Sequence, residues 1–256
     1  MTPDTSFFAT RLARDETDLL SAQRLRYAVF VRELGGDGAM VDHAAGLERD
    51  EFDPIVDHLI LTDSRRPEGE HVVGVYRLLP GERAEDFGRF YCDDEYDLTR
   101  LRRSGRRLLE LGRSCVHPSL RGGTGMFLLW NALADYVLER DIDLLFGVAS
   151  FHGTDPESLA QPLSWLHHNH LSPESLRARA RVYQTMDLVP PEALDRRAAM
   201  AAMPPLIKAY LRLGGTVGDG AFIDHPFNTT DVLLLVDTKA MSERHRSFYT
   251  TRATSG

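Results

Sequence analysis

The chain has 256 residues, 43% of them apolar and 27% charged, which is typical of a globular protein and excludes a fully disordered one. Thirty Lys and Arg against 38 Asp and Glu give a formal net charge of −8, so nonspecific nucleic-acid binding, which requires phosphate neutralisation, is not expected. Two cysteines are too few for a disulfide framework, and no stretch approaches the roughly 20 apolar residues of a membrane span.

The first half of the chain predicts several elements in order. Its patterns favour a strand, a helix that stops at a glycine pair, a loop and then a two-stranded hairpin. The polar segment after the hairpin predicts an irregular stretch, followed by a strand, a loop and a strongly apolar helix. The ranges are 8–13, 19–34, 35–55, 56–62 with 71–79, 80–105, 108–116, 118–125 and 126–140.

The second half begins with a continuous apolar run at 144–150, which suits a buried central strand. Thr154 and Glu157 then predict a capping box that opens a helix. Two proline pairs, at 190–191 and 204–205, each precede a helical pattern, and residues 232–236 predict a last buried strand. The order of elements favours an α/β (α+β) fold: a mixed sheet with helices on its faces, not an alternating doubly wound one.

Charged residues inside apolar elements are the first candidates for chemistry. Glu110 and Arg113 lie in one apolar strand, where a charge is costly to bury unless it is paired or used. An exposed Glu–Arg salt bridge is the alternative.

Three more segments carry charges of interest. The loop 48–53 holds four carboxylates, Arg26 lies on the first helix, and Arg77 ends a hairpin strand. Each also has a plain interpretation, as a solvated acidic loop, an exposed helical arginine or an edge charge.

Two further patterns concern anions. Arg121 and the glycines after it directly precede a helix, where free backbone N–H groups can bind phosphate, although a plain helix start is as good an interpretation. A run of five arginines suggests a docking patch for an acidic partner, against the alternative of a solvated charge run: Arg100, Arg102, Arg103, Arg106 and Arg107.

The segment 167–170 holds three histidines, but no metal site is expected. It lacks the Glu of a metallopeptidase helix, and no Cys or second His cluster completes a tetrahedron. No Gly-x-Ser-x-Gly elbow is present, so a serine hydrolase is not expected either.

Taken together, these segments resemble one family. Arg26-Tyr27-x-Val29-Phe30, Asp50-x-x-Asp53, Tyr76-Arg77-Leu78-Leu79 and Glu110-x-x-Arg113 follow the order seen in acyl-homoserine-lactone synthases, relatives of the Gcn5-type N-acetyltransferases. The longer resemblance is to bacterial ornithine N-acyltransferases of ornithine-lipid synthesis, and lactone synthases should lack the run from about 183 on. Its supporting strings are 57–59, 74–79, 109–116, 145–151, 183–188, 204–208 and 218–221.

The resemblance implies a Gcn5-related N-acyltransferase-like mixed sheet with helices on both faces. It implies one domain over residues 1–256, with a mainly helical insertion at about 154–215. The implied reaction moves a fatty 3-hydroxyacyl group from acyl carrier protein to the α-amine of ornithine. The alternatives are glutamine or another amino acid as acceptor, a lactone synthase, or a non-catalytic module that binds a carrier protein or lipid.

The resemblance also assigns residues. Glu110 is the expected base, acting directly or through a water, and Arg113 orients it. Asp50 and Asp53 complete the catalytic group and also serve the acceptor pocket. The expected substrate-binding residues are Arg26, Phe30, Arg77, Ser150 and Phe151, the last two on the acyl side. The expected residues for the thioester of the donor are Ser114, Cys115, Val116, Arg121, Gly123 and Gly125.

The expected donor is the phosphopantetheine thioester of acyl carrier protein, with no metal and no permanently bound cofactor. The superfamily signature for coenzyme A, Arg/Gln-x-x-Gly-x-Gly/Ala, would place Leu120 at its basic position, with Arg121 one place late. A carrier protein fits better because it presents only the pantetheine arm, and it would dock on the arginine run. The expected location is the cytoplasm, with contact to the inner membrane surface left open.

The spacing of Glu110 and Arg113 makes a geometric prediction. Side chains three apart on a flat strand lie on opposite faces, so both reach one cleft only if a bulge intervenes. Gly112 is the expected position, because glycine tolerates positive φ. The alternative is that Gly112 only allows a helix to pack closely.

Overall fold

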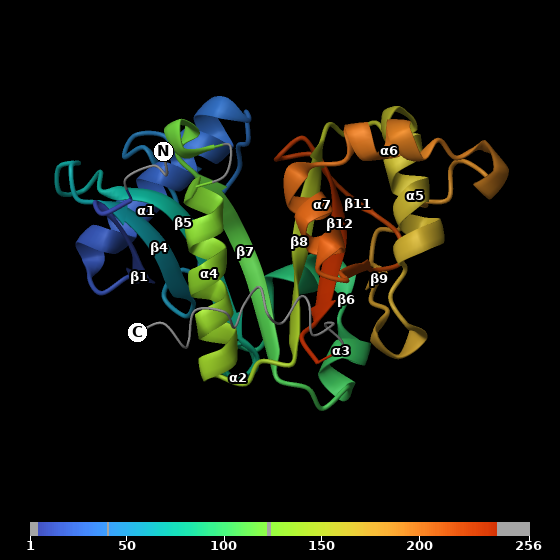
Figure 1. Cartoon of the computed structure of the whole chain (residues 1–256), viewed down its shortest axis with the longest axis horizontal. Coiled ribbons are helices and arrows are strands. Elements are labelled where there is room, and N and C mark those ends of the chain that lie inside the picture. Colours follow the sequence, from blue (N-terminus) through green and yellow to red (C-terminus); the bar gives the residue numbers. More distant parts are fainter. Residues whose placement is uncertain (1–4, 40, 122–123, 240–256) are drawn as a thin grey trace. The chain divides into compact units, whose positions relative to one another are not determined.

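The computed structural model describes residues 5–39, 41–121 and 124–239 (Figure 1). Contacts divide the chain into two compact units, and each is discontinuous in sequence. The first comprises Met1–Phe87 and Leu111–Asp141, and the second comprises Gly88–Glu110 and Ile142–Gly256. Strand β7 (Leu108–Val116) therefore begins in the second unit and ends in the first.

The first unit is built on strands in the order β1-β4-β5-β7. β1 (Phe8–Leu12) pairs antiparallel with β4 (Asp57–Asp63), which pairs antiparallel with β5 (Val72–Pro80). The remaining elements of this unit are α1 (Glu16–Arg26), the π-helix η1 (Tyr27–Glu33), β2 (Val41–Asp42), β3 (Leu47–Glu48), α2 (Gly81–Phe87), η3 (Pro118–Leu120) and α4 (Thr124–Glu139).

Helices α1 and α4 cover opposite faces of this part of the sheet. Val75 of β5 packs in a cluster with Ala22 and Leu25 of α1. A Cβ built on the preceding Gly74 would meet Leu129 of α4 at 2.9 Å. Successive side chains of a strand point to opposite faces, so the two helices lie on the two sides.

The second unit is built on a long antiparallel pair. β8 (Leu144–His152) pairs along its whole length with β12 (Thr229–Asp237), and the first residues of β7 pair in parallel with β8, Leu108 opposite Leu144. The other elements are η2 (Tyr91–Asp94), β6 (Tyr96–Asp97), α3 (Thr99–Arg103), η4 (Glu157–Leu159), α5 (Ala160–His170), η5 (Glu174–Leu176), β9 (Arg179–Ala180), η6 (Pro191–Ala193), α6 (Arg196–Ala202), α7 (Pro205–Arg212), β10 (Thr216–Val217) and β11 (Phe222–Asp224).

The mixed α/β fold is confirmed, with parallel β7/β8 pairing inside a largely antiparallel arrangement. The expected hairpin and the strands at 108–116, 144–150 and 232–236 are present as β4/β5, β7, β8 and β12. The segment 80–105 is not irregular as expected, because it forms α2, η2, β6 and α3.

The predicted capping box at Thr154 is wrong. The side chain of Asp155, not Thr154, accepts the backbone N–H of Glu157, at 3.1 Å. The first turn is the 3-10 helix η4, whose N-cap is Pro156, and α5 follows it.

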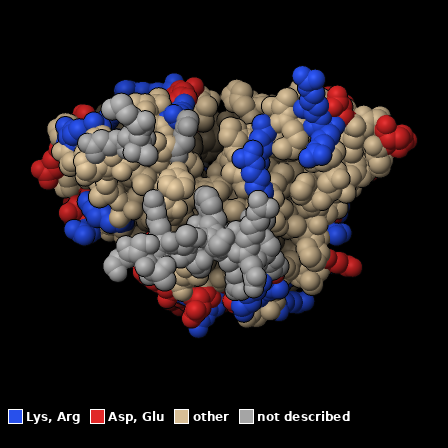
Figure 2. All heavy atoms as spheres, in the orientation of Figure 1, with Lys and Arg blue, Asp and Glu red and all other residues tan. Residues whose placement is uncertain are grey.

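Among the described residues, no helix combines the length and the apolar character needed to cross a bilayer. Cationic and anionic side chains are interspersed over the face shown in Figure 2.

Candidate functional site

Six charged side chains meet in the first unit. They come from the end of α1, from β3 and the turns that follow it, from β5 and from β7. The six are Arg26, Glu48, Asp50, Asp53, Arg77 and Arg113.

Arg26 is the centre of this cluster and has no exposed surface. Its Nε binds Glu48, and its Nη1 lies 2.6 Å from Oδ1 of Asp53. Arg77 Nη1 reaches the same oxygen of Asp53 at 3.0 Å and Oδ1 of Asp50 at 2.6 Å. Arg113 Nε lies 2.9 Å from Oε1 of Glu48. Three cations and three carboxylates thus pair with one another, as burial of charge requires.

The neighbouring arginines lower the pKa of both aspartates. Burial raises the pKa of Asp53, but the neighbouring charges of Arg26 and Arg77 outweigh it and lower the pKa to about 2. The pKa of Asp50 is also lowered, because Arg77 and Arg113 outweigh the effect of burial.

Asp50 and Arg113 form the part of the cluster that retains a hydrogen-bond acceptor. The Oδ2 atom of Asp50 is buried and accepts no hydrogen bond from the described residues. It lies 3.7 Å from Nη2 of Arg113, whose side chain is 12% exposed. This pair of opposite charges is the part of the cluster best placed to exchange its interaction for one with a ligand.

Local structure explains the position of Arg26. α1 ends at Arg26, and the chain continues as the π-helix η1, a rare form that is frequently found at functional sites. Phe30 lies on η1, half-buried against the cluster of apolar residues beneath it.

Glu110 is held in the second unit by a turn of backbone. Its two carboxylate oxygens accept the N–H groups of Tyr91 at 2.8 Å and Cys92 at 2.6 Å, and the residue is 3% exposed. Burial, together with the nearby charge of Glu110, raises the pKa of the Cys92 thiol well above its usual value. Both oxygens of the expected base therefore accept a backbone amide hydrogen bond.

Strand β7 departs from regular geometry at Arg113, not at Gly112. Arg113 has φ +50°, a left-handed conformation that is uncommon for a residue other than glycine. A Cβ built on Gly112 would meet no described atom within 4 Å, so close helix packing does not explain this glycine. The irregularity lies one residue after the predicted position and coincides with a charged residue of the cluster. Such outliers are often found at functional sites.

The remaining expected residues lie in several places. Ser150 is exposed and Phe151 buried on β8, while Ser114, Cys115 and Val116 end β7. Burial raises the pKa of the Cys115 thiol to about 12.

The expected phosphate loop is only partly described. Arg121 pairs with Glu33 at 2.7 Å, outside the six-residue cluster. Gly125, the second residue of α4, lies so close to Leu120 that an added Cβ would lie 3.0 Å from the Leu120 Cβ. Gly123 lies outside the described residues.

The arginine run is not uniform. Arg102 binds Asp93 through both terminal nitrogens and lies over the ring of Phe90, and Arg106 pairs with Asp237. Together with part of η5, three of the arginines line a pocket of about 540 Å³, whose walls are Arg100, Arg103, Ser104, Arg106, Glu174, Ser175 and Leu176.

Sequence reasoning did not select Glu48 as a site residue. It is fully buried and joins Arg26 to Arg113. The available signal was its place in the acidic loop 48–53, but nothing in the loop distinguishes this carboxylate from its neighbours.

Comparisons with known proteins cover nearly the whole chain. It is 68% identical over 247 residues to the L-ornithine N(alpha)-acyltransferase of Rhodobacter capsulatus, covering 96% of this chain and 95% of the relative. It is 44% identical to the protein of the same name from Brucella abortus, covering 93% of this chain and 87% of the relative. The acetyltransferase (GNAT) domain family matches residues 25–131.

Two solved structures share the fold. The acyl-homoserine-lactone synthase LasI has a TM-score of 0.50 and 17% identity, covering 93% of each chain. FeeM, an N-acyl amino acid synthase from uncultured soil microbes, has a TM-score of 0.51 and 14% identity, covering 96% of this chain and 97% of its own.

Proposed function

Because the chain belongs to the L-ornithine N(alpha)-acyltransferase family, we propose that it transfers a 3-hydroxyacyl group from acyl carrier protein to the α-amine of ornithine. The product is lyso-ornithine lipid. The observation that carries the proposal is the 68% identity to the Rhodobacter capsulatus enzyme across 96% of the chain.

The reaction needs three things from the protein. The α-ammonium must lose a proton so that its nitrogen can attack the thioester carbonyl, forming the C–N bond and breaking the C–S bond. The tetrahedral oxyanion needs donors, and the departing thiolate takes up a proton. Atoms and charge balance when one proton ends on the thiol and a second passes to the base and then to water.

Glu110 is the proposed base. Its carboxylate precedes Arg113 by three residues on β7, and its low exposure favours proton transfer through a water over direct contact. Glu110→Gln should lower kcat by about 10²–10⁴. It should also lower Tm, because the new NH₂ group would face a backbone N–H that now donates to Glu110.

The pH profile separates these two roles of Glu110. If Glu110 is the base, kcat/KM of the wild type rises with pH on the acidic side of its profile, and Glu110→Gln lacks this rise. If Glu110 has only a structural role, the variant keeps the shape of the wild-type profile. Wild-type turnover in the variant would exclude Glu110 as the base.

The six-residue cluster is the proposed acceptor site, and Asp50 is its proposed contact with a cationic group of ornithine. The spare Oδ2 of Asp50 supports this role. Asp50→Asn should raise KM for ornithine at least tenfold with a smaller change in kcat. An unchanged KM for ornithine would show that the acceptor does not bind at Asp50.

The pocket between α3 and η5 is the proposed docking point for the acidic carrier protein. Charge complementarity acts mainly on encounter rate and salt dependence. Arg103→Glu should therefore raise KM for the carrier-bound thioester, leave KM for ornithine unchanged, and have little effect with a free pantetheine thioester.

Arg212→Glu is the matched control, since this exposed arginine of α7 lies outside the pocket and makes the same charge change. Arg102 is a poor probe because its pairing with Asp93 is part of the fold. Equal kinetics of the wild type with carrier-bound and free pantetheine thioesters would exclude docking.

The chain is further proposed to work as one N-acyltransferase domain with a mainly helical insertion at about 154–215. The GNAT-domain match supports this, because residues 25–131 include parts of both units. The proposed place of work is the cytoplasm, where carrier-bound acyl groups are made, at the inner membrane surface that receives the lipid.

Lipid mass spectrometry tests the whole proposal. Cells that express the protein should accumulate an ornithine-containing lyso-lipid, and cells that express Glu110→Gln should not. Detection of a glutamine lipid would show that glutamine is the acceptor, and detection of an acyl lactone would indicate a lactone synthase. The absence of any new acyl product would favour a non-catalytic binding module.

A further inference from the structure

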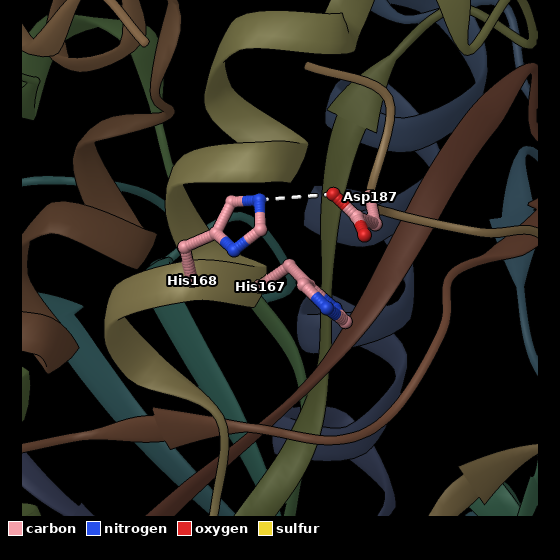
Figure 3. Close-up of side chains that lie close together, drawn as sticks. All are labelled: His167, His168 and Asp187. Carbon is pink, nitrogen blue, oxygen red and sulfur yellow. Dashed lines mark ion pairs between the residues drawn. The ribbon is translucent and has the colours of Figure 1, made fainter. Parts of the chain in front are cut away.

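A second cluster of titratable side chains lies in the second unit, at the end of α5. His167 and His168 are consecutive on this helix, and Asp187 comes from the segment that follows it (Figure 3). One ligand atom from each of the three lies within 4.8 Å of the other two, and Nε2 of His168 is 2.9 Å from Oδ1 of Asp187.

Sequence analysis predicts no metal here, because the segment lacks the Glu of a metallopeptidase helix and no Cys or second His cluster completes the ligand set. The structure supplies a third ligand in Asp187, which is 19 positions beyond His168 in the sequence. Two imidazoles and one carboxylate match a common zinc ligand set, in which water takes the fourth position.

A buried hydroxyl fixes the backbone on both sides of Asp187 to α5. Ser164 is fully buried, donates to the carbonyl of Met186 at 3.0 Å, and accepts the N–H groups of Leu188 and Val189 at 2.9 Å each. The residues on both sides of Asp187 are thus fixed to α5. Ser164 precedes the two histidines by three and four positions, so it lies on the same side of the helix.

We propose that His167, His168 and Asp187 form a binding site for zinc or a similar transition-metal ion, which clamps the segment after β9 to the end of α5. Imidazole ligands favour such ions over Mg²⁺ and Ca²⁺, which take oxygen ligands. Ligand atoms around tetrahedral zinc lie about 3.4 Å apart, as bonds of about 2.1 Å require. The ligand atoms now lie within 4.8 Å of one another, so metal binding requires the exposed His168 and Asp187 side chains to rotate toward the ion.

The competing explanation is a simple surface ion pair, and His167 distinguishes the two. The ion pair joins His168 to Asp187 and does not involve His167. The Nδ1 atom of His167 is buried and has no hydrogen-bond partner among the described residues. A metal site needs His167, and an ion pair does not.

The test uses the full chain, treated with a chelator and titrated with Zn²⁺ alone by calorimetry. We expect one equivalent to bind and to raise Tm. His167→Gln and Asp187→Asn should each weaken binding at least tenfold. The matched control is His170→Gln, which changes a histidine of the same helix outside the cluster and should bind as the wild type does.

Co²⁺ provides a second readout, since a tetrahedral site gives it visible absorption that His167→Gln should abolish. Absence of a bound equivalent, or wild-type affinity in His167→Gln, would overturn the proposal. Loss of binding in His170→Gln alone would also overturn it, by placing the ion elsewhere. None of these outcomes depends on the acyltransferase activity.

Discussion

Arg26 shows what a single buried charge contributes. Its guanidinium has no exposed surface and binds both Glu48 and Asp53. Arg26→Met would leave two buried carboxylates without their central cation, and breaking a buried pair in this way costs about 3–5 kcal/mol.

We therefore expect Arg26→Met to lower the free energy of unfolding by that amount in urea titrations. Arg26→Lys should lose less stability than Arg26→Met, because it keeps the positive charge. It should still lose some, because lysine lacks the planar fork of donors. Equal losses in the two variants would show that charge at this position does not stabilise the fold.

The pKa of Asp53 makes a prediction about acid stability. A carboxyl whose pKa is lowered by folding, here to about 2 from 3.8, stabilises the fold above about pH 4 and loses that effect as pH falls toward 2. The shift corresponds to roughly 2 kcal/mol.

Unfolding measured between about pH 4 and pH 2 should show this loss in the wild type. The slope should be smaller in Asp53→Asn, which starts from a lower stability. An identical slope in the variant would mean that other carboxylates account for the acid sensitivity.

At the scale of elements, β7 shows where sequence analysis succeeds and where it stops. The apolar pattern predicts the strand at its observed bounds, and the separation of Glu110 and Arg113 predicts a bulge at Gly112. The irregularity that the structure shows is instead the positive φ of Arg113. The partner of Arg113 is Glu48, 65 positions away, and no local pattern reveals it.

The helices α2 and α3 were missed for a different reason. Each is at most seven residues long, and each buries a single residue, Ala84 in α2 and Leu101 in α3. A single buried position produces no hydrophobic periodicity in the sequence. Long elements with a continuous or repeating apolar face, such as α4 and β8, were predicted well.

Gly112→Ala tests the geometry of β7. Gly112 has no positive φ, and an added Cβ would meet no described atom within 4 Å. The variant should therefore unfold at a Tm within a few degrees of the wild type. Gly74→Ala is the contrasting control, because its Cβ would lie 2.9 Å from Leu129 and should lower Tm clearly.

At the scale of the whole molecule, the two units are interleaved along the chain. Gly88–Glu110 belongs to the second unit although it precedes part of the first. It contributes Phe90, whose ring packs on Phe146 at 5.0 Å, and Tyr96, whose hydroxyl donates to the carbonyls of Gly220 and Asp231. A fragment that starts at residue 142 lacks all of these contacts.

We predict that the isolated fragment 142–256 does not fold, as NMR chemical-shift dispersion would show. The full chain cut at an inserted protease site after residue 141 should remain associated, because the piece 1–141 still carries Gly88–Glu110. A well-dispersed spectrum from the isolated fragment would contradict this.

The interleaving also orders events during synthesis on the ribosome. The first unit is complete once Asp141 has been made, but the second must wait for β12, which ends at Asp237, 96 residues later. At about 5–20 residues per second, this delay is about 5–20 s. Throughout it, β8 has no β12 beside it, and its apolar residues need protection. The nascent chain is therefore most exposed to aggregation and to chaperones after its first unit has already folded.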